Sequence, residues 1–418
     1  MWIRLFSEKS IHKQMKILVA GYNTVKNGIG VSGRERLLLE ISRKFLDNGI
    51  VVDAFFGNLK GKNASFLKPV SFLFGVLNPL IKRINNLIKL PSYKNRYYSE
   101  LFFDICLRRK ICGKYDYIIT TNPWIPKTAR KAKMHKIEII LLAGNPSDNL
   151  IFDLIRIEKS KINLVNNYDA FDFIKRLNKY NEFAVNVDKV ITINEFTANT
   201  FQQDQYFQNS IVFNVNLVQS IIISQSPNSK LTNEEEFTST DLNVFYLAHT
   251  TTLKGLHYLM ETIINLNSSL GLKIKLYIGG AIDPSYSKIV LDKFKKYNFF
   301  EFLGPLNHQA KVLYYYNCDI FVCPSIIDMS PATVFEAMAN RKPVILTEGC
   351  GNKWIIKNKI NGFIAKTKDP DDLADKLMWC TTNKHLLQSM GENAFNSYVY
   401  YLSQKSQQIN RIIDFIIT

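Results

Sequence analysis

Short apolar runs alternate with amphipathic stretches along most of the chain, which is the pattern of an α/β protein. The clearest example lies within residues 319–346, where an apolar run stops at Pro324 as a buried parallel strand does when it ends in a loop. A helix is predicted from Pro331, with Ser330 as its N-cap, and a second strand follows over 342–346. The segment therefore predicts one βαβ unit.

The loop and the helix of this unit form a candidate anion site. Ligands of parallel sheets bind at the carboxyl ends of strands, where the following helix presents free N–H groups and the positive end of its dipole. Asp328 lies in the predicted loop, and Glu336 shares a helix face with Ala332 and Ala339. A single carboxylate between small residues is suited to accept hydrogen bonds from a diol such as a ribose. An ordinary solvated glutamate is the alternative for this segment alone.

The same alternation fills both halves of the chain. In the first half the predicted strands are residues 16–20, 51–56, 115–120, 138–142, 188–194 and 211–213. In the second half they are residues 243–248, 274–278, 302–304, 319–323 and 342–346. We expect two Rossmann-like domains, at 15–223 and 242–390, joined by a polar linker over 224–241. A helical segment over 391–418 could cross back to the first domain.

A glycine-rich stretch follows the first predicted strand and contains Gly28, Gly30 and Gly33. Its spacing matches a dinucleotide-binding fingerprint, but no acidic residue ends the next strand. A loop that binds another anion, or a simple turn, fits the stretch as well. Since the second half has no such fingerprint, a dehydrogenase is the less favoured reading.

Composition limits the class of protein further. With 418 residues, of which 46% are hydrophobic, the chain is long enough and apolar enough for two cores. Its six cysteines form no C-x-x-C pair and meet no histidine cluster, so we predict neither a metal site nor a disulfide framework. We find no apolar run of signal-peptide length near the N-terminus and no stretch of about 18 uninterrupted apolar residues. A cytoplasmic protein without a membrane span is therefore expected.

The formal net charge of +17 is concentrated in one part of the chain. Between Lys60 and Lys114 there are twelve basic residues and two acidic ones, which gives this window a formal charge of +10. Such a concentration indicates a polyanionic partner: nucleic acid, an anionic membrane or a phosphorylated substrate. No nucleic-acid-binding motif is present, so nucleic acid ranks below the other two.

An amphipathic helix is predicted inside a basic insertion that spans residues 66–114. Its apolar stripe consists of Leu77, Ile81, Ile84 and Ile88, and its polar side carries Lys82, Arg83, Asn85, Asn86 and Lys89. A cationic amphipathic helix is typical of an interfacial membrane anchor. A helix packed on its own domain, with its basic face in water, is the alternative.

Motifs of the second half follow one another in a recognisable order. They are Lys254-Gly255, Gly279-Gly280, Phe302-Leu303-Gly304, Pro324-Ser325, Asp328, Glu336, Ala337-Met338, Lys342-Pro343-Val344-Ile345, Asn361-Gly362-Phe363 and Asp369-Pro370. Each motif alone is weak, but the ordered set resembles retaining glycosyltransferases of family 4. The resemblance covers nearly all of residues 15–400 and includes the first-half run 32–36. It implies a GT-B fold, in which two Rossmann-like domains face each other across a cleft.

The resemblance also implies a reaction and the residues that perform it. A sugar would move from a nucleotide-sugar donor to a glycan or lipid-linked acceptor, with retention of configuration and without a metal or another cofactor. Lys254 and the helix after Ser330 would neutralise the donor diphosphate, and Asp328 would contact the transferred sugar. The implied catalytic residues are Lys254, Asp328 and His249. The implied donor-binding residues are Gly30, Gly33, Lys254, Leu306 (base), Ser330, Pro331, Ala332, Thr333 and Glu336 (ribose).

This chain departs from the family pattern at two positions. His249 stands where the family usually has a phosphate-binding arginine, five residues before Lys254. The first-half histidine that often touches the donor sugar has no counterpart, and Asn145 or Asp148 takes its place. The sequence therefore predicts a glycosyltransferase at the inner face of the cell membrane, bound to its anionic surface. A non-catalytic binding or scaffold subunit of a glycan assembly pathway is the alternative.

Overall fold

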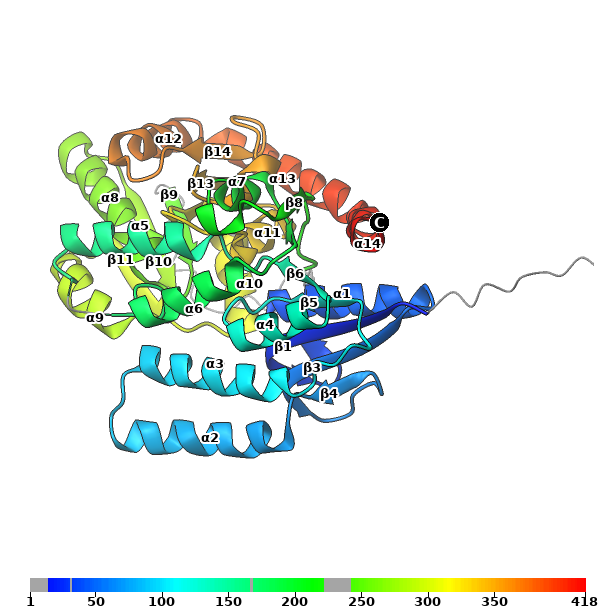
Figure 1. Ribbon diagram of the computed structural model, residues 1–418. Coiled ribbons are helices and arrows are strands. Elements are labelled where there is room, and N and C mark those ends of the chain that lie inside the picture. The colour runs from blue at the N-terminus through cyan, green and yellow to red at the C-terminus, as the bar shows by residue number, and fades with distance from the viewer. Residues whose placement is uncertain (1–13, 31, 166–167, 222–241) are drawn as a thin grey trace, which may run out of the picture. The chain divides into compact units, whose positions relative to one another are not determined.

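The structure is a computed structural model that describes residues 14–30, 32–165, 168–221 and 242–418, without the side chains of Lys82 and Asn86 (Figure 1). The predicted linker at 224–241 lies outside the described residues. The chain divides into two compact units. The first comprises Met1–Leu90, Tyr98–Leu142 and Glu182–Lys189, and the second comprises Pro91–Tyr97, Ala143–Asn181 and Val190–Thr418.

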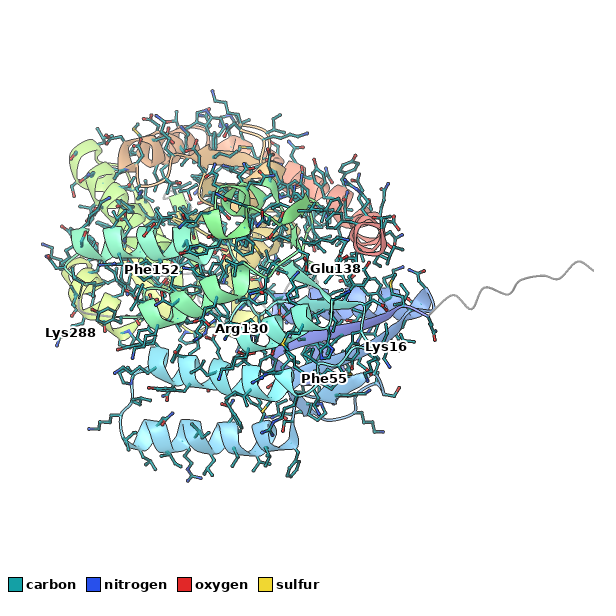
Figure 2. The ribbon with its side chains drawn as sticks, in the orientation of Figure 1. Lys16, Phe55, Arg130, Glu138, Phe152 and Lys288 are labelled. Atoms are coloured by element: carbon teal, nitrogen blue, oxygen red, sulfur yellow. The ribbon has the colours of Figure 1, made fainter. Side chains whose placement is uncertain are left out.

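The first sheet has eight strands in the order β4-β3-β1-β5-β6-β7-β8, with β2 paired antiparallel to β1. Its strands are β1 (Lys16–Lys26), β2 (Ile29–Gly30), β3 (Val51–Lys60), β4 (Leu67–Pro69), β5 (Tyr117–Thr120), β6 (Glu138–Leu142), β7 (Lys189–Thr192) and β8 (Ile211–Asn214). The helices between them are α1 (Gly33–Asp47), α2 (Phe72–Leu87), α3 (Ser92–Arg108), α4 (Pro126–Met134), α5 (Asp148–Lys161), α6 (Ile174–Ala184) and α7 (Glu195–Gln202). Lys16 begins β1, and Phe55 lies on the neighbouring β3 (Figure 2).

The glycine-rich stretch begins with a tight hairpin turn, which agrees with the alternative of a simple turn. Strand β1 continues to Lys26, well beyond the predicted end at Ala20, and pairs with β2. Asn27 (φ 51°) and Gly28 (φ 73°) both have left-handed backbones, as a tight hairpin turn requires. Gly30 lies against the start of α1, because a Cβ there would come within 2.6 Å of the Arg36 nitrogen.

The second sheet has six parallel strands in the order β11-β10-β9-β12-β13-β14. They are β9 (Leu242–Leu247), β10 (Ile274–Gly279), β11 (Phe300–Gly304), β12 (Ile320–Cys323), β13 (Val344–Thr347) and β14 (Gly362–Ala365). The larger helices are α8 (Leu256–Leu270), α10 (His308–Asn317), α11 (Ala332–Ala339), α12 (Pro370–Thr382), α13 (Leu387–Ser403) and α14 (Lys405–Ile417), and α9 (Pro284–Tyr286) is a single turn. In this order the direction of winding reverses between β9 and β12, as in a Rossmann sheet.

Both faces of the second sheet are buried, which explains its continuous apolar strands. Val244 and Tyr246 of β9 face one core, which is covered by α8 and α12 (Figure 1). Phe245 and Leu247 face the other core, which α10, α11 and α13 cover. The alternation follows from the two-residue period of a strand.

Two helices begin at residues whose types favour N-caps. Asn194 caps α7 by accepting a hydrogen bond from the Thr197 N–H, and Asp369 caps α12.

At the C-terminus of the chain, Phe415 of α14 stacks on Phe213 of β8, with ring centroids 4.4 Å apart. Both rings belong to the second compact unit, so α14 covers the end of the first sheet that lies in that unit.

Candidate functional site

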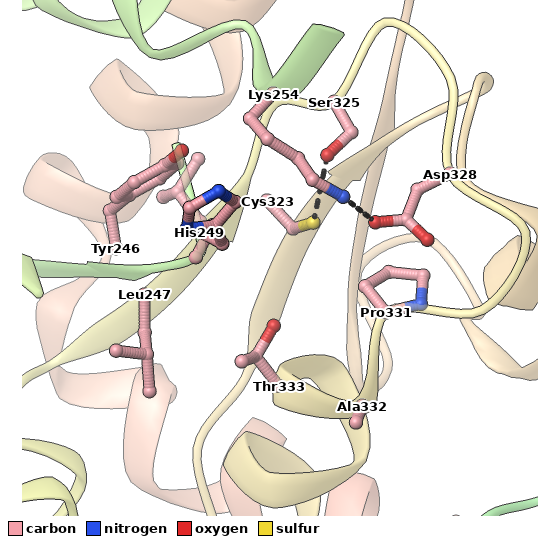
Figure 3. A pocket seen from close by; sticks show the side chains of 12 residues that line it. Tyr246, Leu247, His249, Lys254, Cys323, Ser325, Asp328, Pro331, Ala332 and Thr333 are labelled. Atoms are coloured by element: carbon pink, nitrogen blue, oxygen red, sulfur yellow. Dashed lines mark hydrogen bonds and ion pairs between the residues drawn. The ribbon is translucent and has the colours of Figure 1, made fainter. Parts of the chain in front are cut away.

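A cavity of about 190 Å³ opens at the carboxyl ends of β9 and β12, where the winding of the second sheet reverses (Figure 3). This is the position at which open α/β sheets bind ligands. The lining residues are Tyr246, Leu247, Ala248, His249, Lys254, Val322, Cys323, Ser325, Asp328, Pro331, Ala332 and Thr333. Of the predicted site residues, the cavity thus brings together His249, Lys254, Asp328, Pro331, Ala332 and Thr333.

Gly255 explains how Lys254 reaches this cavity. Its φ of +65° lies in the left-handed region, and a Cβ at this position would come within 2.0 Å of the Pro324 carbonyl oxygen. Only glycine lets the chain pass Pro324 so closely and then enter α8. The glycine of the Lys254-Gly255 motif is therefore required for steric reasons, because a side chain would collide with the Pro324 backbone.

Lys254 and Asp328 form an ion pair in the cavity, with Nζ donating to Oδ2 (Figure 3). Burial disfavours the charge of Lys254, but the Asp328 carboxylate outweighs that effect and raises the pKa of the ammonium. Lys254 is therefore a cation at neutral pH. A phosphate group that enters the cavity would compete with Asp328 for this charge.

The start of α11 corrects one sequence prediction. The helix begins at Ala332, so Pro331 occupies the N-cap position that was predicted for Ser330, and no side chain caps the helix. The reason is the extended backbone of Pro331 (ψ 114°), which delays the helix by one residue. The Ser330 N–H donates to Asp328 Oδ1 at 3.3 Å. The first N–H groups of α11, next to the cavity, therefore remain available to an anion.

His249 follows β9 and is exposed at the cavity. Figure 3 shows its ring near Lys254, whose ammonium points toward Asp328. The cavity thus combines an ammonium group, an imidazole and a helix N-terminus. Such a set can neutralise a diphosphate.

Glu336 lies one turn into α11, outside the residues that line the cavity. It accepts hydrogen bonds from Lys311 Nζ (2.9 Å) and the Tyr315 hydroxyl (3.2 Å). Its side chain is 18% exposed, so it is not the freely solvated glutamate of the alternative reading. Lys311 and Tyr315 are four residues apart on α10, a spacing that places them on one helix face. The sequence reasoning missed both partners.

The remaining predicted residues lie around the cavity or in the other unit. Leu306 follows β11, and a Cβ built on Gly279 would lie 2.9 Å from both Leu306 Cδ1 and Leu247 Cδ1. Leu306 is therefore close to a lining residue of the cavity. Gly30 and Gly33 belong to the first compact unit.

Several lining residues escaped prediction although they follow from the strand pattern. Tyr246, Leu247 and Ala248 end β9, and Val322 and Cys323 end β12. The signal for them was their position at a carboxyl strand end rather than any reactive group. Within the described residues, no three His, Cys, Asp or Glu side chains are grouped so that they could hold a metal ion.

Comparison with known proteins places this site in a recognised segment. Residues 228–397 match the family model described as "Glycosyl transferases group 1". Among curated proteins, an N,N'-diacetylbacillosaminyl-diphospho-undecaprenol alpha-1,3-N-acetylgalactosaminyltransferase of Campylobacter jejuni is 34% identical over 85 residues, which are 20% of this chain and 23% of that protein. The matches to curated relatives span between 21% and 54% of each relative's length.

Solved structures extend the likeness to the whole chain. Sucrose-phosphate synthase from Thermosynechococcus elongatus has a TM-score of 0.62 at 13% identity and covers 97% of this chain and 99% of its own. WaaG, a glycosyltransferase involved in lipopolysaccharide biosynthesis, has a TM-score of 0.60 at 15% identity and covers 95% and 99%. At these identities the likeness establishes the fold. The chain has the GT-B fold of two Rossmann-like domains, and its cavity lies in the segment that matches glycosyl transferases group 1.

Proposed function

We propose that this protein is a retaining glycosyltransferase that moves a sugar from a nucleotide-sugar donor to a glycan or lipid-linked acceptor. The carrying observation is the Lys254–Asp328 pair beside the uncapped start of α11, inside the segment that matches glycosyl transferases group 1. The relative from Campylobacter jejuni carries a diphospho-undecaprenol acceptor in its name, which supports a lipid-linked acceptor.

In this reaction the bond between the anomeric carbon and the diphosphate breaks, and a bond to an acceptor hydroxyl forms. The acceptor loses its proton, and a nucleoside diphosphate departs with increased negative charge. Lys254 and the N–H groups of α11 stabilise that charge, so they contribute to the rate as well as to binding. We propose that these groups make a metal unnecessary. Asp328, released from Lys254 by the diphosphate, would then accept hydrogen bonds from the sugar.

The catalytic reading is favoured over a non-catalytic scaffold subunit because the cavity keeps its charged pair. Lys254, Asp328 and the open start of α11 remain together although His249 replaces an arginine. A scaffold protein would have no need to hold a part-buried ammonium beside a helix N-terminus. His249 lines the same cavity, so we propose that it takes the place of that arginine.

A screen of nucleotide sugars tests this function. The purified protein is incubated with each candidate donor, and slow hydrolysis and thermal stabilisation are measured. We expect one or a few donors to give both signals, and excess chelator to leave the hydrolysis unchanged. Stabilisation without hydrolysis or transfer would favour the scaffold alternative, and a strict need for a divalent metal would contradict metal independence.

We also propose that the protein resides at the inner face of the cell membrane through α2. Of the predicted stripe, Leu77, Ile84 and Ile88 are exposed. Further apolar residues of α2 are exposed as well, by between 50% and 79%: Phe72, Leu73, Val76, Leu80 and Leu87. An apolar surface of this extent on one helix is what an interfacial anchor presents. The alternative, a stripe packed on its own domain, does not explain this exposure.

Cations on α2 are separate from other basic residues of the window. Lys68 and Lys114 pair with Asp53, the latter at 3.3 Å. Burial alone would raise the pKa of Asp53, but hydrogen bonds from Lys68, Tyr115 and Lys114 lower it to about 2. Those two lysines therefore share one carboxylate within the first unit, to which Lys16 also lies at 3.8 Å. Arg83 and Lys89, by contrast, are exposed on and just after α2.

Within the described residues, no helix is long and apolar enough to cross a membrane.

A further inference from the structure

Three consecutive carbonyl groups precede α11, and each accepts a hydrogen bond from a side-chain amide. The bonds run from Asn194 Nδ2 to Met329 O (2.8 Å), from Gln219 Nε2 to Ser330 O (3.1 Å) and from Asn352 Nδ2 to Pro331 O (3.1 Å). All six residues belong to the second compact unit. We call the three amides the carbonyl clamp.

The clamp residues are held firmly and lie outside the cavity lining. Asn194 and Asn352 are 1% and 0% exposed, so their amides have little access to water as an alternative partner. The Oδ1 of Asn194 is used as well, because it caps α7. Gln219 is fixed through its main chain, whose carbonyl accepts a hydrogen bond from the Tyr398 hydroxyl at 3.2 Å.

The direction of these carbonyl groups matters to an anion. A carbonyl oxygen carries partial negative charge, so a peptide that turned its oxygen into the cavity would repel a diphosphate. The three oxygens are bound to the clamp, and the Pro331 oxygen also accepts from the Val334 N–H at 3.1 Å, so α11 starts at Ala332 and Thr333, which both line the cavity (Figure 3). No side chain caps α11 and competes for those N–H groups.

We propose that Asn194, Gln219 and Asn352 are positioning residues that orient the loop 329–331 so that α11 presents N–H groups, and not carbonyl oxygens, to the donor diphosphate. The proposal rests on the proposed function. The new element is that two segments preceding residue 222 in the chain affect the affinity of the cavity at the second sheet for diphosphate. Asn194 and Gln219 lie there, while the groups that contact the anion lie after residue 242.

Three substitutions remove one bond each with little other change. Asn194→Ser keeps an N-cap of comparable strength for α7 but cannot reach Met329. Gln219→Met and Asn352→Leu keep a similar size and remove the N–H donor without adding a charge. The matched control is Asn267→Leu, which in the same way removes an amide bond to the Ile274 carbonyl (2.9 Å) at the amino end of β10, away from the cavity.

Affinity is measured by titration calorimetry with inorganic diphosphate and with a panel of nucleoside diphosphates, alongside the thermal midpoint of each variant. We expect each clamp variant to bind diphosphate about tenfold more weakly than wild type, which corresponds to about 1.4 kcal/mol. The control should bind as wild type does, even where its thermal midpoint falls. That split between affinity and stability would not arise from a merely structural role.

Each other outcome overturns the proposal. Clamp variants that bind as tightly as wild type show that the carbonyl groups need no positioning, while the proposed function stands. An equal loss in Asn267→Leu shows a general effect of stability. A wild type that binds no nucleoside diphosphate overturns the clamp and the proposed function together. If a buried variant fails to fold, Gln219→Met, at a half-buried position, decides the question alone.

Discussion

Among single residues, Lys254 has the most direct connection to the proposed chemistry. Its ammonium is kept charged by Asp328 and lies at the edge of the cavity where a diphosphate would bind. The pair is part-buried, with side-chain exposures of 26% and 17%. Removal of Lys254 would take away the charge that attracts the anion. It would also leave the Asp328 carboxylate without its partner, where it repels the anion.

We predict that Lys254→Ala lowers kcat/KM for transfer by the equivalent of about 2–4 kcal/mol, because a charged contact to the departing diphosphate is lost. Lys376→Ala is a close control, since Lys376 pairs with Asp372 on α12 at 2.8 Å with similar exposure. Steady-state kinetics of both variants and a circular dichroism spectrum check the prediction. Near-native transfer by Lys254→Ala would remove Lys254 from the site.

His249 is a second residue whose charge bears on the proposed reaction. Histidine changes charge near neutral pH, whereas arginine remains a cation. If the imidazole contacts the diphosphate as a cation, transfer by wild type falls once rising pH removes that charge, and His249→Arg flattens that fall. The pH profile of kcat/KM distinguishes the two. Superimposable profiles would show that the imidazole has no such part.

At the scale of the element, α8 contains a buried titratable group that the proposed reaction does not use. His257 is 3% exposed, and its Nδ1 lies 2.7 Å from the Tyr286 hydroxyl. Burial lowers the pKa of its imidazole to about 4 from an ordinary value of 6.5. The folded protein therefore holds His257 neutral in a pH range where the unfolded chain protonates it.

We predict that the stability of the second unit falls as pH is lowered from about 6.5 toward 4, because the unfolded state then binds more protons than the folded state. The full effect is about 3 kcal/mol, and above pH 6.5 it is absent. His257→Phe should lose this acid dependence. Thermal midpoints measured between pH 7 and pH 4.5 give the comparison, and equal slopes in both proteins would contradict the burial argument.

The whole molecule has a formal net charge of +17, and helix α2 exposes several apolar side chains. Cations near an anionic leaflet contribute on the order of 1 kcal/mol each, and the apolar side chains of α2 can enter the headgroup boundary. Both effects act together only at a surface that is negatively charged. Membrane attachment at α2 would keep the enzyme beside a lipid-linked acceptor.

We therefore predict binding to anionic but not to zwitterionic vesicles, weakening as salt rises. A variant with Lys82, Arg83 and Lys89 all changed to Glu should lose it. The control changes Lys288, Lys293 and Lys296 to Glu, which alters the net charge equally in the second unit. Cosedimentation measures each case. A wild type that does not bind anionic vesicles at low salt would contradict the proposed membrane attachment through α2.

Local patterns in the sequence determined most of the elements. Apolar runs located five of the six strands described in the second sheet and missed β14, while Asn194 and Asp369, residue types that favour N-caps, cap their helices. These signals act over a few residues, so they need no knowledge of the rest of the chain. They failed at Pro331, where one backbone angle determined the first residue of the helix. They also failed in β1, where the strand extends beyond its apolar run.

Tertiary structure alone decided which side chains meet. Asp328 and Glu336 have the same chemistry and lie eight positions apart, yet one pairs with Lys254 and the other with Lys311 and Tyr315. Asn194 reaches Met329 across a separation of 135 residues. The sequence therefore determined the fold class and the edge of the sheet at which the cavity opens. The partners at that edge depend on how distant segments pack, because a hydrogen bond requires contact in space and leaves no periodic trace along the chain.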